Sequence, residues 1–170
     1  GAAMMIRSID YKAVGGLDGR FFAHNEEIDM CWRLRSMGRK IYCVPESSVF
    51  HVGGGTLPKS NSQKTFLNFR NNLLMIYKNV DDSELDHVLR VRRILDYVAA
   101  YWTLFRGNFG DFMAIYRARR EFHRLVPSFK ESRAKTQCNV KLHHIPERTK
   151  FSILAHYHLK GHKVFSSLPI

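Results

Sequence analysis

Residues 24–38, with the sequence HNEEIDMCWRLRSMG, hold three carboxylates beside two arginines and a tryptophan. Glu26, Glu27 and Asp29 have the chemistry of a general base, because a positioned carboxylate can take a proton from a substrate hydroxyl. Acidic residues are also favoured in the first turn of a helix, where the helix dipole is positive. On a helix Glu26 and Asp29 share a face, whereas Glu27 points elsewhere. Spacing alone favours a solvated helix start with ordinary ion pairs and leaves a catalytic base as the alternative.

A second chemical candidate is His51, which is followed by Val52 and the glycines 53–55. A neutral imidazole is a good transition-metal ligand, and consecutive glycines let a backbone approach a ligand closely. The glycines lack the following lysine and hydroxyl residue of a P-loop, so they are a weak phosphate signal. A half-buried histidine before a flexible turn explains the pattern equally well, and both interpretations stay open.

The acidic stretch needs an element to position it. Apolar residues recur every three positions from Ile28 to Met37 and Gly38 follows, which predicts an amphipathic helix from Glu26 with a glycine stop. A short helix is predicted over residues 8–16. Three short apolar runs predict strands: residues 4–6, 40–47 and 48–56. This mixture of strands and helices predicts an α/β head.

The rest of the chain favours helices. Apolar periodicity predicts helices over residues 61–78, 83–105 and 111–125, with a break at 107–111. Ser83 with an acidic residue three positions later has the form of a capping box. We therefore predict two parts: an α/β head, residues 1–78, and a basic aromatic helical tail, residues 79–170.

Charge is unevenly distributed along the 170 residues, which carry a net charge of +12. Residues 1–58 hold 7 Lys and Arg against 6 Asp and Glu, whereas residues 59–170 hold 20 against 9. A cationic body favours anionic membrane, nucleic acid or phosphorylated ligands. Aromatic residues lie among the arginines of residues 90–124, which suits a helix on a membrane surface and equally a nucleic-acid backbone or a solvated bundle.

The cysteines and the hydropathy exclude two classes of protein. Cys31, Cys43 and Cys138 are odd in number and form no CxxC pair, which argues against a disulfide framework and favours a reducing cytosolic setting. No apolar run approaches 18 residues, so no segment is predicted to span a bilayer alone.

Four motifs in order resemble the family 2 glycosyltransferases, in particular the rhamnosyltransferase-like bacterial branch that builds cell-surface polysaccharides. They are GAAMMIR (1–7), GGLDGRFF (15–22), EEIDMCWR (26–33) and HVGGGT (51–56). The segment TFLNFRNNLLMIYKN (65–79) is also similar to these proteins. The resemblance implies an α/β fold, namely the C-terminal part of a GT-A (nucleotide-diphospho-sugar transferase) fold followed by a basic α-helical tail.

The resemblance also implies an inverting, metal-dependent transferase. In this family the acidic helix start supplies the base, which removes the acceptor hydroxyl proton as that oxygen attacks the anomeric carbon of a nucleotide sugar. The position six before Arg33 is usually Asp in the family and is Glu27 here. We therefore expect Glu27 to be the base, with Asp29 as the second choice and Glu26 as an orienting neighbour.

Further site residues follow from the same resemblance. His51 is expected to help hold Mn²⁺ or Mg²⁺, which stabilises a diphosphate leaving group. Gly1 and Ala2 are expected near the donor. The remaining expected substrate-binding residues are Asp18, Trp32, Arg33, Gly53 and Gly54.

One departure from the family pattern changes the expectation for activity. Family members bind the nucleotide and most of the metal through an N-terminal half that ends in Asp-x-Asp, and this sequence contains no Asp-x-Asp. The chain is therefore expected to be the acceptor-side part of an enzyme and inactive alone. The implied partners are a nucleotide-sugar donor, a glycan or lipid-linked acceptor and the anionic inner face of the cell membrane, without nucleic acid. The alternative is a non-catalytic basic module that binds anionic membrane or nucleic acid.

Overall fold

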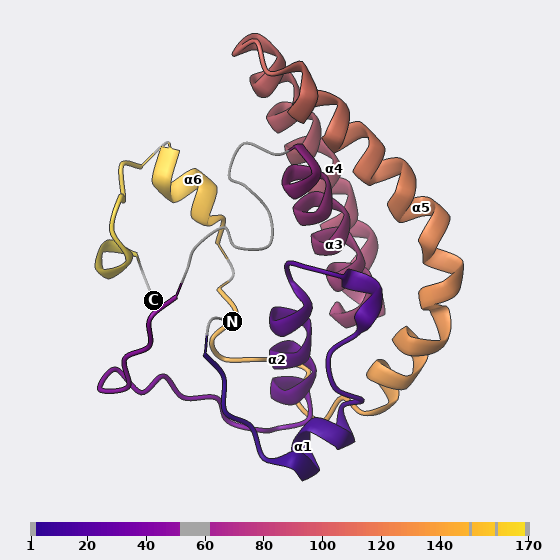
Figure 1. Cartoon of the computed structure of the whole chain (residues 1–170), viewed down its shortest axis with the longest axis vertical. Helices are drawn as coiled ribbons and strands as arrows, with labels where there is room; N and C mark the ends of the chain where they lie inside the picture. The colour runs from indigo at the N-terminus through magenta and orange to yellow at the C-terminus, as the bar shows by residue number, and fades with distance from the viewer. Residues whose placement is uncertain (1–2, 52–61, 150, 159, 169–170) are drawn as a thin grey trace.

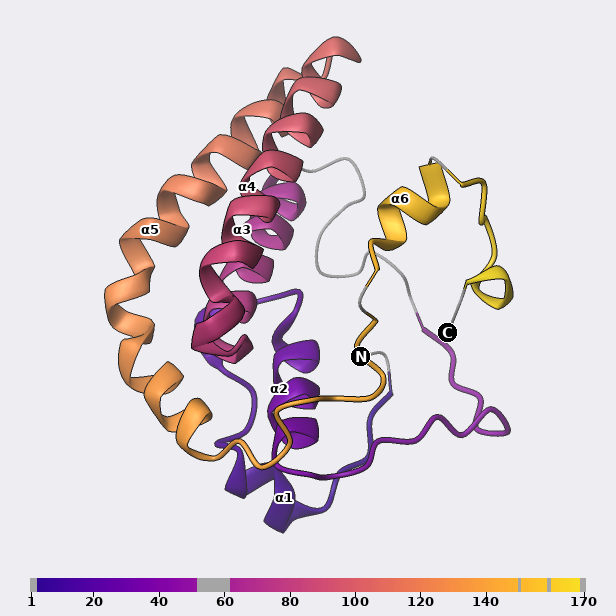
Figure 2. The same cartoon turned by 180° about the vertical axis from the view of Figure 1, so that it is seen from behind.

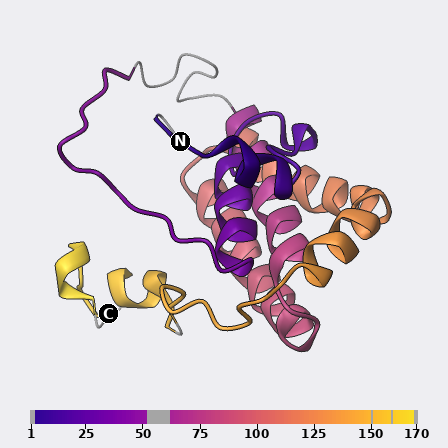
Figure 3. The ribbon, with the colours of Figure 1, turned by 90° about the horizontal axis from the view of Figure 1, so that it is seen from below.

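The structure, a computed structural model, describes residues 3–51, 62–149, 151–158 and 160–168. Figure 1 shows three long helices side by side, with shorter helices across one end of them. Seen from below in Figure 3, the extended segment after the first short helices loops away from this helical body.

The long helices are α3 (Ser62–Asn79), α4 (Asp82–Phe105) and α5 (Phe109–Cys138). The most extensive packing is between α3 and α5, and α5 also packs along α4. In both Figure 1 and Figure 2, α5 curves around the other two helices. These elements confirm the helices predicted over residues 61–78 in the head and over 83–105 and 111–125 in the tail. Within the described ranges, no helix is both long and apolar enough to cross a bilayer.

The short elements are α1 (Ser8–Ala13), η1 (Gly19–Phe21), α2 (Glu26–Ser36), α6 (Ile153–His158) and η2 (Phe165–Ser167). Helix α2 packs on α3, whereas α6 and the C-terminal segment stand apart from the bundle in all three views. The helix predicted to begin at the first glutamate of the EEIDMCWR motif is confirmed, and the glycine that follows it adopts a left-handed φ of +82°.

The predicted α/β fold, a C-terminal part of a GT-A domain, is wrong. The described residues contain helices and turns but no strand and no sheet. The runs predicted as strands at 4–6 and 40–47, and the described part of the third run, residues 48–51, lie outside any ladder. A strand must exchange backbone hydrogen bonds with a neighbour, and these segments have no such partner among the residues that the structure describes. Their large side chains are correspondingly exposed, with Met5 and Phe50 fully so.

The ends of two tail helices also differ from the prediction. Helix α4 is capped by Asp81, whose carboxylate accepts hydrogen bonds from the Ser83 backbone N–H at 3.0 Å and hydroxyl at 2.8 Å. The capping box predicted at Ser83 is therefore wrong. Helix α5 passes residue 125 and continues through Pro127, which lacks a donor for the preceding turn. Tertiary contacts offset that loss, because Phe129 is fully buried in the core two residues later.

A single core joins the two predicted parts of the chain. Phe21, from the first part, meets Phe129 of α5 edge to face with ring centroids 6.1 Å apart. Leu73 and Leu74 of α3 lie in the same cluster, together with Phe122. The predicted boundary after residue 78 therefore falls inside one packed unit. Burial of these apolar side chains is the main term that holds α3 and α5 together.

Candidate functional site

The loop that leads into the acidic helix has an unusual backbone. Phe22, His24 and Asn25 all have φ between +66° and +69°, a region that L-residues rarely adopt. For Phe22, with ψ of −61°, the conformation lies outside the left-handed helical region as well. Strained backbone of this kind persists only where surrounding contacts hold it, and it gathers at functional sites.

Asn71 of α3 supplies those contacts. Its fully buried side-chain amide donates to the carbonyl oxygens of Phe21, Ala23 and His24 at 2.9, 2.7 and 2.8 Å. The neighbouring Arg70 also reaches the Phe21 carbonyl, at 3.1 Å. An amide has two N–H donors, so three carbonyls share them in one convergent site. The strained loop, and with it the start of α2, is fixed from α3.

Asp29 lies at the centre of a buried polar network. Its carboxylate is 2.7 Å from Arg33 Nη2, 2.9 Å from Lys78 Nζ and 2.7 Å from Asn79 Nδ2, and it is fully buried. Arg33 also donates to the carbonyl oxygens of Val14 and, at 2.8 Å, Gly16. Buried charges need such pairing because unpaired ones cost several kcal/mol. The network fastens α2 to α3 and to the glycine turn.

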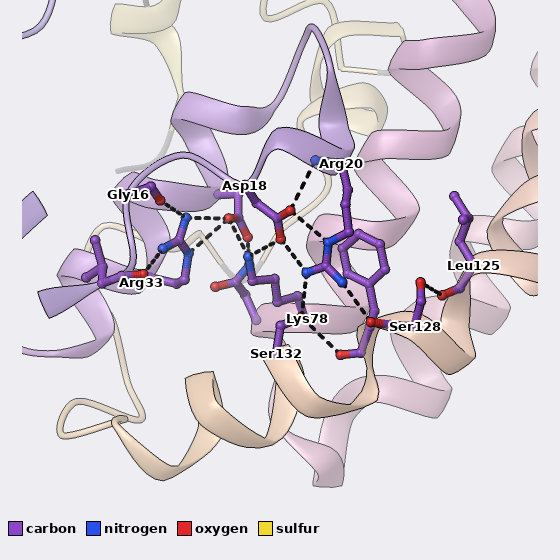
Figure 4. Close-up of polar contacts among 12 residues, drawn as sticks. Gly16, Asp18, Arg20, Arg33, Lys78, Leu125, Ser128 and Ser132 are labelled. Atoms are coloured by element: carbon purple, nitrogen blue, oxygen red, sulfur yellow. Dashed lines mark hydrogen bonds and ion pairs between the residues drawn. The ribbon is translucent and has the colours of Figure 1, made fainter. Parts of the chain in front are cut away.

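Asp18 extends this network toward α5, as Figure 4 shows. Its carboxylate accepts from Lys78 at 3.0 Å and from Arg20 at 2.6 and 2.8 Å. Arg20 in turn donates to the Ser128 carbonyl at 2.7 Å and to the Ser132 hydroxyl at 2.9 Å. Its guanidinium also lies 3.7 Å from the centre of the Phe129 ring, a cation–π contact. This network of ion pairs and hydrogen bonds therefore links η1, α2, α3 and α5.

A cavity of about 530 Å³ opens beside this network, between the turn at Gly15 and Gly16 and the last third of α5. Asp18, Arg20, Arg33 and Lys78 contribute to its wall. Lys12 and Lys135 also line it; both are exposed, and neither forms an ion pair within the described residues. The cavity wall is thus cationic overall, although its buried cations are already paired with carboxylates or carbonyls.

The ion pairs of Asp18 make folding stability depend on pH. Burial by itself raises the pKa of Asp18, but the hydrogen bonds from Arg20 and Lys78 outweigh it and hold the pKa far below the ordinary 3.8. A depressed pKa contributes stability that is present above the unfolded value and is lost as pH falls below about 4. We expect the free energy of unfolding, measured with urea from pH 6 to pH 2.5, to fall more steeply for the wild type than for Asp18→Asn. Equal slopes would show that these ion pairs add no pH-dependent stability.

The structure separates the three carboxylates of the acidic helix start. Asp29 faces inward and is enclosed by its partners, whereas Glu26 and Glu27 are half-buried at the first turn of α2. Burial opposes the ionisation of Glu27, but hydrogen bonding led by its own backbone amide lowers its pKa below the ordinary value. The lowered pKa keeps Glu27 ionised at neutral pH, the form that accepts a proton, and makes it a weaker base than an ordinary glutamate.

The other predicted site residues lie in different places. Asp18 and Arg33 join Asp29 in the buried network, and Trp32 packs against the core cluster. His51 is exposed at the end of the extended segment. Gly1, Ala2, Gly53 and Gly54 lie outside the described residues. In the part of the chain that the structure describes, no three His, Cys, Asp or Glu side chains converge as metal ligands, and the expectation that His51 helps hold Mn²⁺ or Mg²⁺ stays a prediction.

Sequence reasoning missed Asn71, Lys78 and Arg20. The sequence places Asn71 and Lys78 in the helical segment TFLNFRNNLLMIYKN (65–79) but predicts no role for either side chain. The available signal was the position of Asn71 and Lys78. They are polar residues seven apart, on a helix face that also carries Leu67, Leu74 and Met75. A polar side chain on an apolar helix face needs a buried partner.

Comparisons with protein families, with curated proteins and with solved structures find no match to this chain.

Proposed function

We propose that this chain supplies the general base of an inverting glycosyltransferase, with Glu27 as that base. Glu27 accepts the proton of an acceptor hydroxyl while the oxygen attacks the anomeric carbon of a nucleotide sugar. The bond from that carbon to the diphosphate breaks in the same step, and the nucleoside diphosphate leaves. The resemblance of the four sequence motifs to the family 2 glycosyltransferases supports this reaction class. The proposed substrates are a nucleotide-sugar donor and a glycan or lipid-linked acceptor.

The observation that carries the proposal is that the carboxylates of Asp29 and Glu27, at the start of α2, have different surroundings. Asp29 is enclosed by Arg33, Lys78 and Asn79, so its carboxylate is committed to structure. Glu27, two positions earlier, lies on another side of the helix and is held ionised. The strained loop before it is clamped by Asn71, which fixes where the first turn lies. A base must be positioned to within hydrogen-bond reach of its proton, and this arrangement provides that rigidity.

The proposed proton transfer is assigned to Glu27 and the substrates, and no step of it passes through a metal ion. A divalent ion would neutralise the leaving diphosphate when bound. His51 is the residue of this chain that the sequence motifs assign to such an ion, and it is exposed at the end of the extended segment.

Replacing Glu27 tests the proposal. In the full-length gene product that contains this chain, assayed with a panel of nucleotide sugars and lipid-linked acceptors, we expect Glu27→Gln to lower kcat by about 10²–10⁴-fold, the usual worth of a positioned base. Release of nucleoside diphosphate, dependent on the acceptor, is the readout. The fold should be unchanged, as measured by circular dichroism and thermal unfolding, because Gln keeps the shape of the side chain.

Glu131→Gln is the matched control, because Glu131 is exposed and far along α5 from the acidic helix start. It should leave kcat unchanged. Absence of acceptor-dependent transfer with every donor, or full activity of Glu27→Gln, would contradict the proposal. A non-catalytic basic module, the alternative from the sequence, would lose no binding when Glu27 is replaced.

A further inference from the structure

The second half of helix α4 presents most of its large apolar residues to solvent instead of to the core. Six large side chains at helical spacing form this surface, here called the outer stripe, and their exposed fractions run from 37% for Leu95 to 86% for Phe105. The stripe consists of Ile94, Leu95, Val98, Tyr101, Trp102 and Phe105. In a helix of a water-soluble bundle such a stripe faces the core. Here the stripe stays exposed, although Tyr101 at its edge contacts Phe112 of α5.

The opposite face of α4 explains why the helix is turned this way. Its two buried residues are Asp96 and Ala100. The Asp96 carboxylate is 2.7 Å from Arg119 Nη1 of α5 and 2.6 Å from Arg92 Nε, so α4 is fastened to α5 through an ion pair. Rotating α4 to bury the outer stripe would expose Ala100 and separate Asp96 from Arg119. The outward stripe is therefore fixed by the packing and is not a flexible end.

Exposed apolar residues continue around the closed end of the α4–α5 hairpin. Phe109 and Met113 of α5 are 62% and 40% exposed. The hairpin itself is held together by aromatic contacts, such as Tyr101 with Phe112, whose ring centroids lie 5.9 Å apart. Its closed end extends beyond the start of α3 in Figures 1 and 2. The exposed apolar side chains at this end of the hairpin are therefore placed where another surface can contact them.

The charges beside the outer stripe are positive. Arg90 lies at one edge of it, and Arg106 stacks over Trp102 at 5.1 Å at the other. Neither arginine is paired with a carboxylate in the described part of the chain. The only acidic residue of α4 beyond residue 86 is Asp96, which is buried and paired. A partner for this surface must therefore accept apolar side chains and offer negative charge.

We propose that the outer stripe and the closed end of the α4–α5 hairpin dock on an anionic phospholipid surface. Acidic headgroups pair with Arg90 and Arg106, while Trp102 and Phe105 enter the boundary between headgroups and acyl chains. A second copy of the chain that docks through the same face brings the same arginines and no opposite charge. Nucleic acid satisfies the arginines but leaves the stripe in water. The proposal goes beyond sugar transfer and stands without it, because vesicle binding needs neither donor nor acceptor.

Flotation with vesicles tests this inference. Vesicles of phosphatidylcholine with about 30% phosphatidylglycerol should bind the protein, and pure phosphatidylcholine vesicles should bind it more weakly, with the difference reduced by salt. The variant Phe105→Ser/Phe109→Ser should bind at least about tenfold more weakly, because one buried phenylalanine is worth that much or more. Trp102 fluorescence should shift to shorter wavelength on binding, with Trp32→Phe used to isolate its signal.

Phe165→Ser is the matched control, because Phe165 is 79% exposed in η2, away from the hairpin. It should bind vesicles as the wild type does. Equal binding of the hairpin variant and the wild type, or no binding to anionic vesicles, overturns the proposal. So does a lipid-free dimer in analytical ultracentrifugation that dissociates in the hairpin variant, because a second copy would then cover the stripe.

Discussion

Replacing Asp29 by asparagine is expected to lower the free energy of unfolding by about 3–5 kcal/mol, the cost of breaking a buried ion pair by removing one partner. Asparagine has the shape of aspartate, so the packing stays, but the negative charge is lost and one acceptor oxygen becomes an N–H donor that faces other donors. Lys78 and Arg33, 4% and 7% exposed at their side chains, would then be buried without their central carboxylate. Urea unfolding followed by circular dichroism at pH 7 measures the change.

Asp86→Asn is the control for this substitution. Asp86 is exposed on α4 and its carboxylate has no partner within the described residues, so the expected change is within about 0.5 kcal/mol. The double variant Asp29→Asn/Lys78→Met also removes one of the two buried cations around residue 29, while Asp18 keeps its ion pair with Arg20, and it should recover part of the loss. A change below about 1 kcal/mol for Asp29→Asn would mean that solvent reaches the network and that the α2–α3 junction is looser than the structure shows.

The helices of this protein were predictable from sequence, but their faces and neighbours were not. The 3.6-residue period identifies α2, α3 and α4 because it is a local property of the chain. The strands were predicted from short apolar runs alone, and a run such as residues 40–47 becomes a strand only where another strand pairs with it. The sequence pattern also did not predict which face of α4 turns toward the core. The period marks an apolar stripe and a polar face, and the buried pair of Asp96 with Arg119 reverses the usual choice of which face turns inward.

In the candidate site, too, some residues were predictable from the sequence and others were not. The carboxylates at the start of α2 stood out by type and spacing, and the expectation that Glu27 is the base stays a prediction. The partners of Asp29 could not be read from spacing, because Lys78 and Asn79 lie about 50 positions further along the chain and meet it only through tertiary packing. Asn71 was hidden for the same reason. Long-range polar contacts depend on the fold, which the local pattern does not determine.

Replacing Phe129 by alanine is expected to lower the free energy of unfolding by about 3–5 kcal/mol, the range for truncating a large aromatic side chain in a core. Phe129 is fully buried, contacts Phe21 edge to face and lies under the guanidinium of Arg20. The cavity left behind would remove the contact between α5 and the loop before α2. Urea unfolding of the whole chain measures the loss, and Phe105→Ala, the same change at an exposed position of α4, should stay within about 0.5 kcal/mol.

The shape of that unfolding transition decides how the chain is organised. If the first 78 residues and the helical tail share one core, as the contact of Phe21 with Phe129 indicates, loss of Phe129 weakens both together and one transition remains. Fluorescence of Trp32 in α2 and of Trp102 in α4 should then report the same midpoint. Two separated midpoints in Phe129→Ala would show that the parts fold independently, with the predicted boundary after residue 78 as a true division. A coincident shift would make the position of Glu27 depend on a helix that begins more than 80 residues after it.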